Sequence, residues 1–390
     1  MKRENNKAVL YLVPFFVDVA IGMIFISIPL LAIELGASAL TLGELGFIGG
    51  LFYVLFSLPF GKLSDRLGRK YIILSGSLGY FLSSFALSVS TQLYQLFIFM
   101  ALLGIAGAMF WPSLEAWIAE REDKKPLTKR ISFFNVSWCA GAAVGPLVGG
   151  VLFQLNHRLP LYLASFLSLL MAFLILNEPL DEKREDSFAL REDLSERNID
   201  PEGNSPSRGK AFSYLYAAWI ANFTGYFSIG MIRYLFPKLS VQLNIQPFIL
   251  GILLGVVALS QTLTFYILGR VSFWHYRWLP LFSLQLLGII GLIFIFLGNS
   301  LTIFLLAFTL VGVGAGMSYF SSIFYGLSGH QDRGTKSGIH EAVLGGGALF
   351  GPLVGGIFAQ AYSLRTPYLV AIFVIVAGII GEALLIHMSR

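Results

Sequence analysis

The chain has 390 residues, of which 56% are hydrophobic and only 13% are charged, and its formal net charge is +5. A soluble domain usually carries about a quarter charged residues, so this composition excludes an ordinary soluble protein and indicates a helical protein that crosses a membrane many times. The distribution of the positive charge, described next, explains the net charge without a nucleic-acid partner.

Twelve apolar stretches recur along the chain, most of them near or above the roughly 20 residues that a helix needs to cross a bilayer. If the N-terminus lies in the cytoplasm, 23 of the 27 Lys and Arg residues fall on segments that face the cytoplasm. The positive-inside rule therefore predicts that both termini are cytoplasmic, in a multi-pass protein of the cell (inner) membrane. The predicted spans of this all-α membrane protein are roughly 8–34, 41–60, 71–90, 92–118, 131–154, 160–178, 211–239, 246–268, 278–298, 301–327, 337–361 and 366–388.

The first predicted span carries a charged residue at membrane depth. Asp18 lies about ten residues into the span, roughly 15 Å along a helix, where a charge is expensive and usually functional. One interpretation is that Asp18 exchanges a coupling proton, or binds another coupling cation, during transport. The alternative is that hydrogen bonds hold Asp18 in place and thereby orient the helix.

The first loop predicted to face the cytoplasm reads GKLSDRLGRK. Its glycines permit a tight turn, and Asp65 could accept hydrogen bonds from a nearby helix N-terminus, where the dipole favours an anion. The segment resembles the signature G-x-L-x-D-R-x-G-R-[KR] of the major facilitator superfamily, and the matching residues are Gly61, Leu63, Asp65, Arg66, Gly68, Arg69 and Lys70. The resemblance implies twelve transmembrane helices in two parallel six-helix halves, with this loop as part of a cytoplasmic gate.

The fourth predicted span ends in FWPSLEAWIAE, which contributes two acids and an aromatic candidate for a cavity wall, Trp111. The resemblance implies that Glu120, at the inner end, meets Arg69 of the gate. Glu115 lies five residues before Glu120 and therefore deeper in the membrane. It is interpreted either as a gate residue paired with a base or as a second protonation site. Many proton antiporters carry an arginine in this helix, but Met100 occupies that position here, so coupling through that arginine is not expected.

The fifth and eleventh spans share the string GPLVGG. Small residues let membrane helices pack closely, and proline can bend such a helix. The longer segment GAAVGPLVGG in the fifth span resembles the glycine-rich motif of the drug–proton antiporter branch of the superfamily. Close packing explains both copies, and a signal for export is the alternative for the first. The predicted packing residues are Gly145, Pro146, Gly149, Gly351, Pro352 and Gly355.

A polar segment with nine acidic and six basic residues separates two blocks of six spans. The blocks align at an offset of 208 residues, which brings Gly22 onto Gly230. This alignment indicates a parallel duplication, as in the two halves of a major facilitator transporter. The predicted units are an N-terminal bundle at 1–178, a cytoplasmic linker at 179–210 and a C-terminal bundle at 211–390.

The seventh predicted span carries Arg233 on the same helical face as Tyr226. The repeat mate of Arg233 in the first span is Phe25, so the duplication does not require a charge there. Arginine can bind a carboxylate or a phosphate through two parallel hydrogen bonds. Arg233 is therefore a candidate anion-binding residue, and an interhelical or gating ion pair is the alternative. A direct pair with Asp18 would be strained, because the two residues differ in depth by about 10 Å.

Gln261 and Tyr325, in the eighth and tenth predicted spans, are candidates to line a cavity because of the number of their span. Glu341 falls in the first turn of the predicted eleventh span, where an acid is favourable to the helix dipole, and it is expected at the cytoplasmic gate. A titrating pair of His340 and Glu341 is the alternative.

The resemblance implies a central cavity lined by spans 1, 4, 7 and 10, with spans 2, 5, 8 and 11 at its sides. No nucleotide-binding, cofactor or metal motif appears in the sequence, so neither an enzyme nor an ATP-driven pump is predicted. We predict a monomeric secondary active transporter, surrounded by membrane lipids, that moves a small amphipathic organic solute by proton-coupled efflux. The alternatives are a carrier of an organic or lysolipid-like anion anchored by Arg233, and a receptor that kept the fold without transport.

Overall fold

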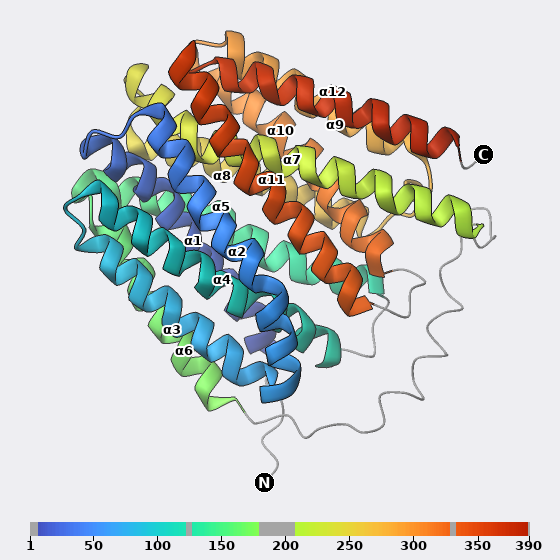
Figure 1. The fold of residues 1–390 in the computed structure, drawn as a ribbon, viewed down its shortest axis with the longest axis horizontal. Helices are drawn as coiled ribbons and strands as arrows, with labels where there is room; N and C mark the ends of the chain where they lie inside the picture. Colours follow the sequence, from blue (N-terminus) through green and yellow to red (C-terminus); the bar gives the residue numbers. More distant parts are fainter. Residues whose placement is uncertain (1–6, 122–126, 179–206, 328–332, 389–390) are drawn as a thin grey trace.

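The structure is a computed structural model that describes residues 7–121, 127–178, 207–327 and 333–388. These residues form twelve α-helices, and the described part of the chain contains no strand (Figure 1). The helices are α1 (Lys7–Glu34), α2 (Ala39–Leu67), α3 (Arg69–Ser88), α4 (Leu93–Arg121), α5 (Leu127–Leu155), α6 (Leu159–Asn177), α7 (Arg208–Gln242), α8 (Pro247–Leu268), α9 (Trp278–Leu297), α10 (Leu301–Leu327), α11 (Arg333–Ala361) and α12 (Thr366–His387).

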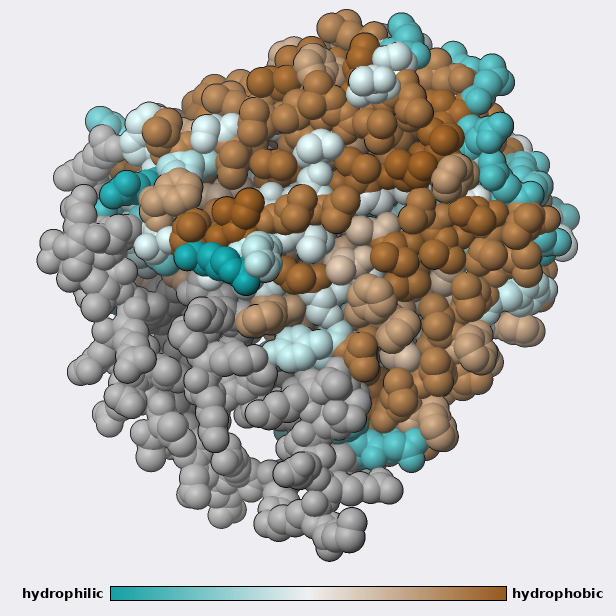
Figure 2. Space-filling model, turned by 180° about the vertical axis from the view of Figure 1, so that it is seen from behind, coloured by the Kyte–Doolittle hydropathy of each residue, from teal (hydrophilic) through white to brown (hydrophobic). Residues whose placement is uncertain are grey.

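Eleven of these helices are long and apolar enough to cross a bilayer. The exception is α7, which is the longest at 35 residues but is rich in Tyr and Gly and carries Arg233 and Lys238. Helices satisfy their own backbone hydrogen bonds, which is why they suit a hydrocarbon environment. Figure 2 shows the outer surface of one face, where apolar side chains cover most of the area and hydrophilic residues gather towards the rim.

The predicted spans and the helices agree closely, with two informative differences. The predicted loop at 61–70 is almost entirely helical, because α2 continues to Leu67 and α3 begins at Arg69. Gly68 makes the whole turn with φ of 100°, a conformation that favours glycine. The eleventh helix begins at Arg333, so the placement of Glu341 in a first turn was wrong: it lies about two turns inside the helix.

The twelve helices form two halves of the same internal design. In the first half α1 packs on α5 and α2 packs on α4; in the second half α7 packs on α11 and α8 packs on α10. The halves meet mainly through α5 against α8 and α2 against α11. The side on which α1 begins and α12 ends is called the terminal side below, and the opposite side is called the far side. Towards the terminal side, the outer helices of the two halves diverge (Figure 1).

The two GPLVGG strings occupy equivalent positions in the two halves. A methyl group on Gly22 of α1 would lie 2.7 Å from Cδ of Pro146, and one on Gly230 of α7 would lie 2.8 Å from Cδ of Pro352. Two glycines of each string contact a helix of their own half: Gly145 and Gly149 face α1, and Gly351 and Gly355 face α7. The third glycine, Gly150 or Gly356, faces α8 or α2 of the opposite half. Each string therefore permits a close approach of two helices within its own half.

Each string also contacts the opposite half. The backbone carbonyl of Pro146 lies against Gly251 of α8, and the carbonyl of Pro352 lies against Gly43 of α2. The two glycines are themselves repeat mates at the offset of 208. A side chain at either position would collide with backbone atoms, so these contacts hold the two halves close to one another.

Candidate functional site

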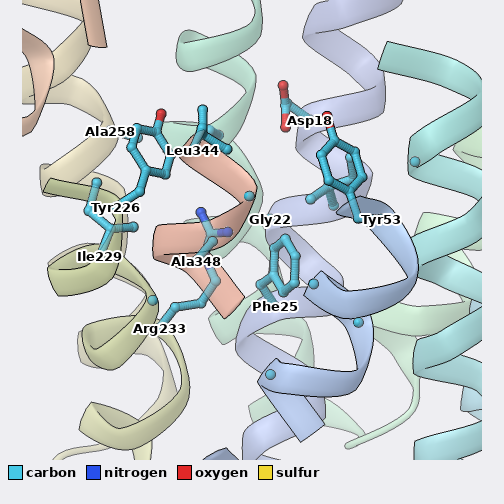
Figure 3. Close-up of a pocket in the computed structure, with 18 of the residues that line it drawn as sticks. Asp18, Gly22, Phe25, Tyr53, Tyr226, Ile229, Arg233, Ala258, Leu344 and Ala348 are labelled. Atoms are coloured by element: carbon cyan, nitrogen blue, oxygen red, sulfur yellow. The ribbon is translucent and has the colours of Figure 1, made fainter. Parts of the chain in front are cut away.

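A cavity of about 270 Å³ lies between the two halves. Side chains from α1, α2, α4 and α5 line one wall, and side chains from α7, α8, α10 and α11 line the other, with Tyr80 of α3 behind them. Figure 3 shows Asp18 and Tyr53 at one end of this cavity and Arg233 and Phe25 towards the other. Because helices of both halves surround the cavity, a rocking motion of the halves would change its access.

Most of the residues predicted for the site line this one cavity. They are Asp18, Trp111, Glu115, Tyr226, Arg233 and Gln261. Glu341 also lines the cavity, although it was expected at the gate, because α11 begins earlier than predicted. The sequence had therefore identified polar groups from five different helices that the tertiary structure brings to a single site.

Asp18 is held against the α5 backbone and is 8% exposed. A methyl group on Gly141 would lie 3.1 Å from Cβ of Asp18, so the absence of a side chain there makes room for the aspartate. One carboxylate oxygen, Oδ2, has no hydrogen-bond partner in the described structure. Asp18 is thus a buried acid at the cavity wall with unused hydrogen-bonding capacity.

Arg233 extends from α7 towards Phe25 of α1, with its guanidinium carbon 4.2 Å from the centre of the phenyl ring. This cation–π contact joins the two halves, and Tyr234 packs edge-on against the same ring at 6.1 Å. Within the described part of the chain, no ion pair joins Arg233 to Asp18. The guanidinium is therefore held by an aromatic face and keeps its hydrogen-bond donors towards the cavity (Figure 3).

Two acids and a tyrosine from three helices meet on the cavity wall. The hydroxyl of Tyr53 on α2 donates to Oε2 of Glu341 on α11 at 2.7 Å. Glu115 of α4 lines the same cavity. His340 lies behind this group, with Nε2 at 3.8 Å from Oε1 of Glu341 and Nδ1 at 2.7 Å from Oγ of Ser322.

Aromatic rings form much of the remaining wall. Tyr319 of α10 packs against Trp138, Tyr226 and His340, with ring centres 5.4, 5.9 and 4.8 Å apart respectively. Gln261 of α8 lies beside Tyr226 and is 5% exposed. A site of this kind offers flat apolar surface together with a few fixed polar groups, which suits an amphipathic organic molecule.

Tyr325 does not line the cavity. Its hydroxyl accepts a hydrogen bond from the backbone N–H of Tyr276 at 2.8 Å, and its ring packs near Trp274. Trp274 and Tyr276 belong to the loop between α8 and α9, in which Tyr276 has a φ angle of 51°. Tyr325 lies about two turns nearer the terminal side than Tyr319, so its helix number alone was a poor guide to its depth.

The signature segment makes contacts within the first half. Arg69 forms an ion pair with Asp65 and donates to Oγ of Ser64 at 2.6 Å. Lys70 donates to the carbonyl of Glu178 at 2.5 Å and so ties α3 to the end of α6. The side chain of Glu120, the predicted partner of Arg69, lies outside the described residues, as do residues 179–206 of the predicted linker.

Two residues that line the cavity, Tyr53 and Trp138, were not predicted from the sequence. Tyr53 is the repeat mate of Gln261 at the offset of 208, so applying the duplication to every candidate would have found it. Trp138 carries no such signal, because single aromatic residues are common in a chain with 35 Phe and 16 Tyr. Among the described residues, no group of three His, Cys, Asp or Glu could hold a metal ion.

Comparison with known proteins gives one family. The profile of the Major Facilitator Superfamily matches residues 10–327 and 218–389, which together span nearly the whole chain. The chain is 24% identical over 386 residues to the quinolone resistance protein NorA of Staphylococcus aureus (strain COL), covering 95% of this chain and 94% of that protein. It is 29% identical over 175 residues to multidrug resistance protein 1 of Bacillus subtilis (strain 168), covering 45% of each.

Solved structures show the same fold at low identity. A mutant of the nucleoside transporter NupG superposes with a TM-score of 0.68 at 14% identity, over 97% of this chain and 99% of that one. A bacterial homolog of the human lysosomal transporter Spinster, in an inward-facing and occupied conformation, gives 0.68 at 16% identity, over 98% and 95%. The human organic anion transporter MFSD10 gives 0.64 at 19% identity, over 96% and 97%.

Proposed function

The chain belongs to the Major Facilitator Superfamily of membrane transporters, and from this premise we propose that it exports small amphipathic organic solutes in exchange for protons. The observation that carries the proposal is the cavity between the halves, where flat aromatic surface surrounds acids on α1, α4 and α11. Aromatic surface suits a range of planar apolar molecules, and buried acids can hold either a proton or a cationic group.

The names of the two bacterial relatives support export rather than uptake. One is a quinolone resistance protein and the other a multidrug resistance protein. The longer match reaches across both halves, so the resemblance includes every helix that lines the cavity. The topology proposed with this function has both termini in the cytoplasm, as the distribution of Lys and Arg predicts.

In the proposed cycle Asp18 carries a proton in one orientation and releases it in the other. Its place on α1, its burial and its free Oδ2 atom support this role. The negative charge left after release would favour binding of a cationic or zwitterionic solute, so the two ligands would alternate on the site.

A second candidate function is transport of an organic anion, and the position of Arg233 favours it. The guanidinium faces the cavity from an aromatic support and can bind a carboxylate or phosphate with two parallel hydrogen bonds. An amphipathic anion could place its charged group at Arg233 and its apolar part along the aromatic wall.

The proposed function predicts proton-coupled movement of an amphipathic cation in proteoliposomes. With an inside-acidic gradient and the fluorescent cation ethidium outside, the wild-type protein should accumulate ethidium and dissipate the pH gradient. Asp18→Asn removes the titratable group while keeping its shape, so uphill accumulation should fall to the protein-free level. The measurements are ethidium fluorescence and the signal of a trapped pH dye.

Glu382→Gln provides the matched control. Glu382 is another fully buried acid, hydrogen-bonded to Gln285 at 2.8 Å, but it lies on α12 away from the cavity lining. This variant should retain coupled transport. Wild-type protein that moves neither ethidium nor any other amphipathic cation under a pH gradient would refute the proposed function.

A further inference from the structure

A second, small cavity of about 20 Å³ lies inside the C-terminal half, and it is called the C-half cavity below. It lies between α7, α9, α10 and α12, which pack against one another (Figure 1). The polar side chains that line it are Thr224 and Ser228 of α7, Gln285 of α9 and Ser318 of α10, and none of these lines the cavity between the halves. A particle the size of one water molecule fits, since about 10–15 Å³ is enough for it.

A buried acid, Glu382 of α12, adjoins the C-half cavity. It accepts a hydrogen bond from Nε2 of Gln285 at 2.8 Å. On its other side, a methyl group on Gly378 would lie 3.8 Å from Oε1 of Glu382 and 2.9 Å from Cγ2 of Thr224. Glu382 is 0% exposed and Gln285 is 4% exposed, yet Oε1 of each lacks a hydrogen-bond partner among the described residues. Buried oxygens of this kind normally have a partner.

The hydrogen atoms of the polar lining are already used. The hydroxyls of Thr224, Ser228 and Ser318 each donate to a backbone carbonyl of their own helix, at 3.1, 3.0 and 3.0 Å. Both amide hydrogens of Gln285 are used as well, on Glu382 and, at 3.4 Å, on the carbonyl of Leu281. The lining therefore presents lone pairs to the C-half cavity, which suits a positive ion and not an anion.

Charge and size restrict the ion to a small monovalent cation. Within the described part of the chain, no ion pair joins Glu382 to a base, and one carboxylate balances one positive charge. Mg²⁺ usually keeps several of its waters, and Ca²⁺ takes six to eight oxygen ligands. The C-half cavity has room for one water-sized particle, so neither divalent ion fits.

We propose that the C-half cavity is a binding site for Na⁺. The ligands are side-chain oxygens of Thr224, Ser228, Gln285 and Ser318, and the Glu382 carboxylate balances the charge. The ion joins α7, α9 and α10 through its ligands and α12 through Glu382, and so stabilises the packing of the C-terminal half.

The bound Na⁺ takes no part in the exchange of protons for solute. All four helices belong to one half, which moves as a unit when the halves rock, so the site keeps its geometry through a transport cycle. This inference goes beyond the proposed function and does not depend on it.

Binding of ²²Na⁺ to the purified full-length protein in detergent, measured by scintillation proximity, tests the site directly. The wild-type protein should bind about one ion per chain, which unlabelled Na⁺ displaces and choline or ethidium does not. Thermal unfolding gives a second measurement, because a ligand of the folded state raises its stability. Replacing choline chloride by NaCl at constant ionic strength should raise the apparent Tm by at least about 2 °C, and the rise should saturate.

Two serines of α10 make the test specific. Ser318→Ala removes one proposed ligand oxygen, so Na⁺ should bind at least about tenfold more weakly. Ser321→Ala is the matched control: Ser321 is also buried and donates within its own helix, to the carbonyl of Ser318, but it does not line the C-half cavity. This variant should bind Na⁺ like the wild type. Glu382→Gln removes the balancing charge and should lose both the bound ²²Na⁺ and the rise in Tm.

Each possible failure has a distinct meaning. Wild-type protein that binds no ²²Na⁺, with the same Tm in NaCl and in choline chloride, would overturn the site. Equal Na⁺ affinity of Ser318→Ala and Ser321→Ala would also overturn it, because the ion would then bind elsewhere. If Ser318→Ala aggregates, Ser228→Ala removes another ligand oxygen and takes its place in the comparison. Loss of coupled ethidium transport in the wild type, with ²²Na⁺ still bound, would refute the proposed function alone.

Discussion

Arg233 and Asp18 illustrate how single residues depart from the internal duplication. The repeat mate of Arg233 is Phe25, and the repeat mate of Asp18 is Tyr226. The position equivalent to each charged residue in the other half is therefore occupied by an aromatic residue. In the structure Arg233 lies directly over its own mate, Phe25, at 4.2 Å. The duplication therefore leaves aromatic residues in the equivalent places, and the charges give the cavity one acidic and one basic end (Figure 3).

The anion-carrier candidate makes a prediction at this scale. Arg233→Ala should weaken binding of an amphipathic carboxylate or phosphate by about ten- to a hundredfold, because a hydrogen bond to a charged group contributes ~1.5–3 kcal/mol. Arg233→Lys should give an intermediate loss, since lysine cannot form the two-pronged contact. Thermal shift of the purified protein with dodecyl phosphate measures the effect.

Ethidium serves as the internal control, because a cation gains nothing from a guanidinium and its binding should not weaken in either variant. Unchanged binding of the anion in both variants would show that Arg233 does not anchor it, and would leave the cation–π contact with Phe25 as its role.

At the scale of helices, the close contacts of α5 and α11 depend on residues without side chains. Gly351 faces the backbone carbonyl of Phe227 on α7, whereas a methyl group on Gly338 of the same helix would meet nothing within 4 Å. The same helix thus contains a glycine that packing requires and one that it does not. The repeated proline and glycine, poor choices for an isolated helix, fit a helix held by its neighbours.

This contrast predicts that a glycine-to-alanine substitution changes the stability of the protein differently at the two positions. Gly351→Ala should destabilise the protein by ~1–3 kcal/mol, the usual cost of overpacking a core, and should lower the apparent Tm in detergent. Gly338→Ala should leave the Tm unchanged or raise it slightly, because alanine favours the helix and meets no neighbour. Equal Tm values for the two variants would contradict the close packing of α11 on α7.

At the scale of the whole molecule, contacts on the far side join the two halves. The Gln154 amide donates to Oε1 of Gln246 at 3.2 Å between α5 and the start of α8. Lys238 of α7 donates to the carbonyl of Ala37 before α2 at 2.5 Å. These contacts lie opposite the diverging ends seen in Figure 1, so the structure is closed on the far side. Transport by alternating access requires that this side opens.

A reversible cross-link should therefore stop transport. In a Cys139→Ser background, Gln154→Cys/Gln246→Cys joined by a short bis-methanethiosulfonate reagent should lose coupled ethidium transport, and a reducing agent should restore it. The control joins two helices of one half, through Phe85→Cys/Tyr162→Cys, whose rings lie 6.4 Å apart on α3 and α6. Transport that continues with the far side cross-linked would show that the halves do not separate there.

Local patterns in the chain were enough to predict the helices, the internal duplication and the family. Span length and hydropathy are local properties, so all twelve helices could be located from the sequence, with their ends within a few residues except at the C-terminal end of α2. The repeat offset and the signature at 61–70 did not depend on packing. Even Asp18, Arg233 and Glu115 could be selected as candidates, because a charge within an apolar run is conspicuous.

Which of these groups meet depends on how distant helices pack against one another. Tyr53 and Glu341 are 288 residues apart in the chain yet share a hydrogen bond, while Tyr325 lies in an aromatic cluster outside the cavity. Depth and rotation of a side chain depend on where its helix begins and on the helices packed against it. Contact between the halves, which no local pattern encodes, is what joins Tyr53 to Glu341 and makes one site from separate helices.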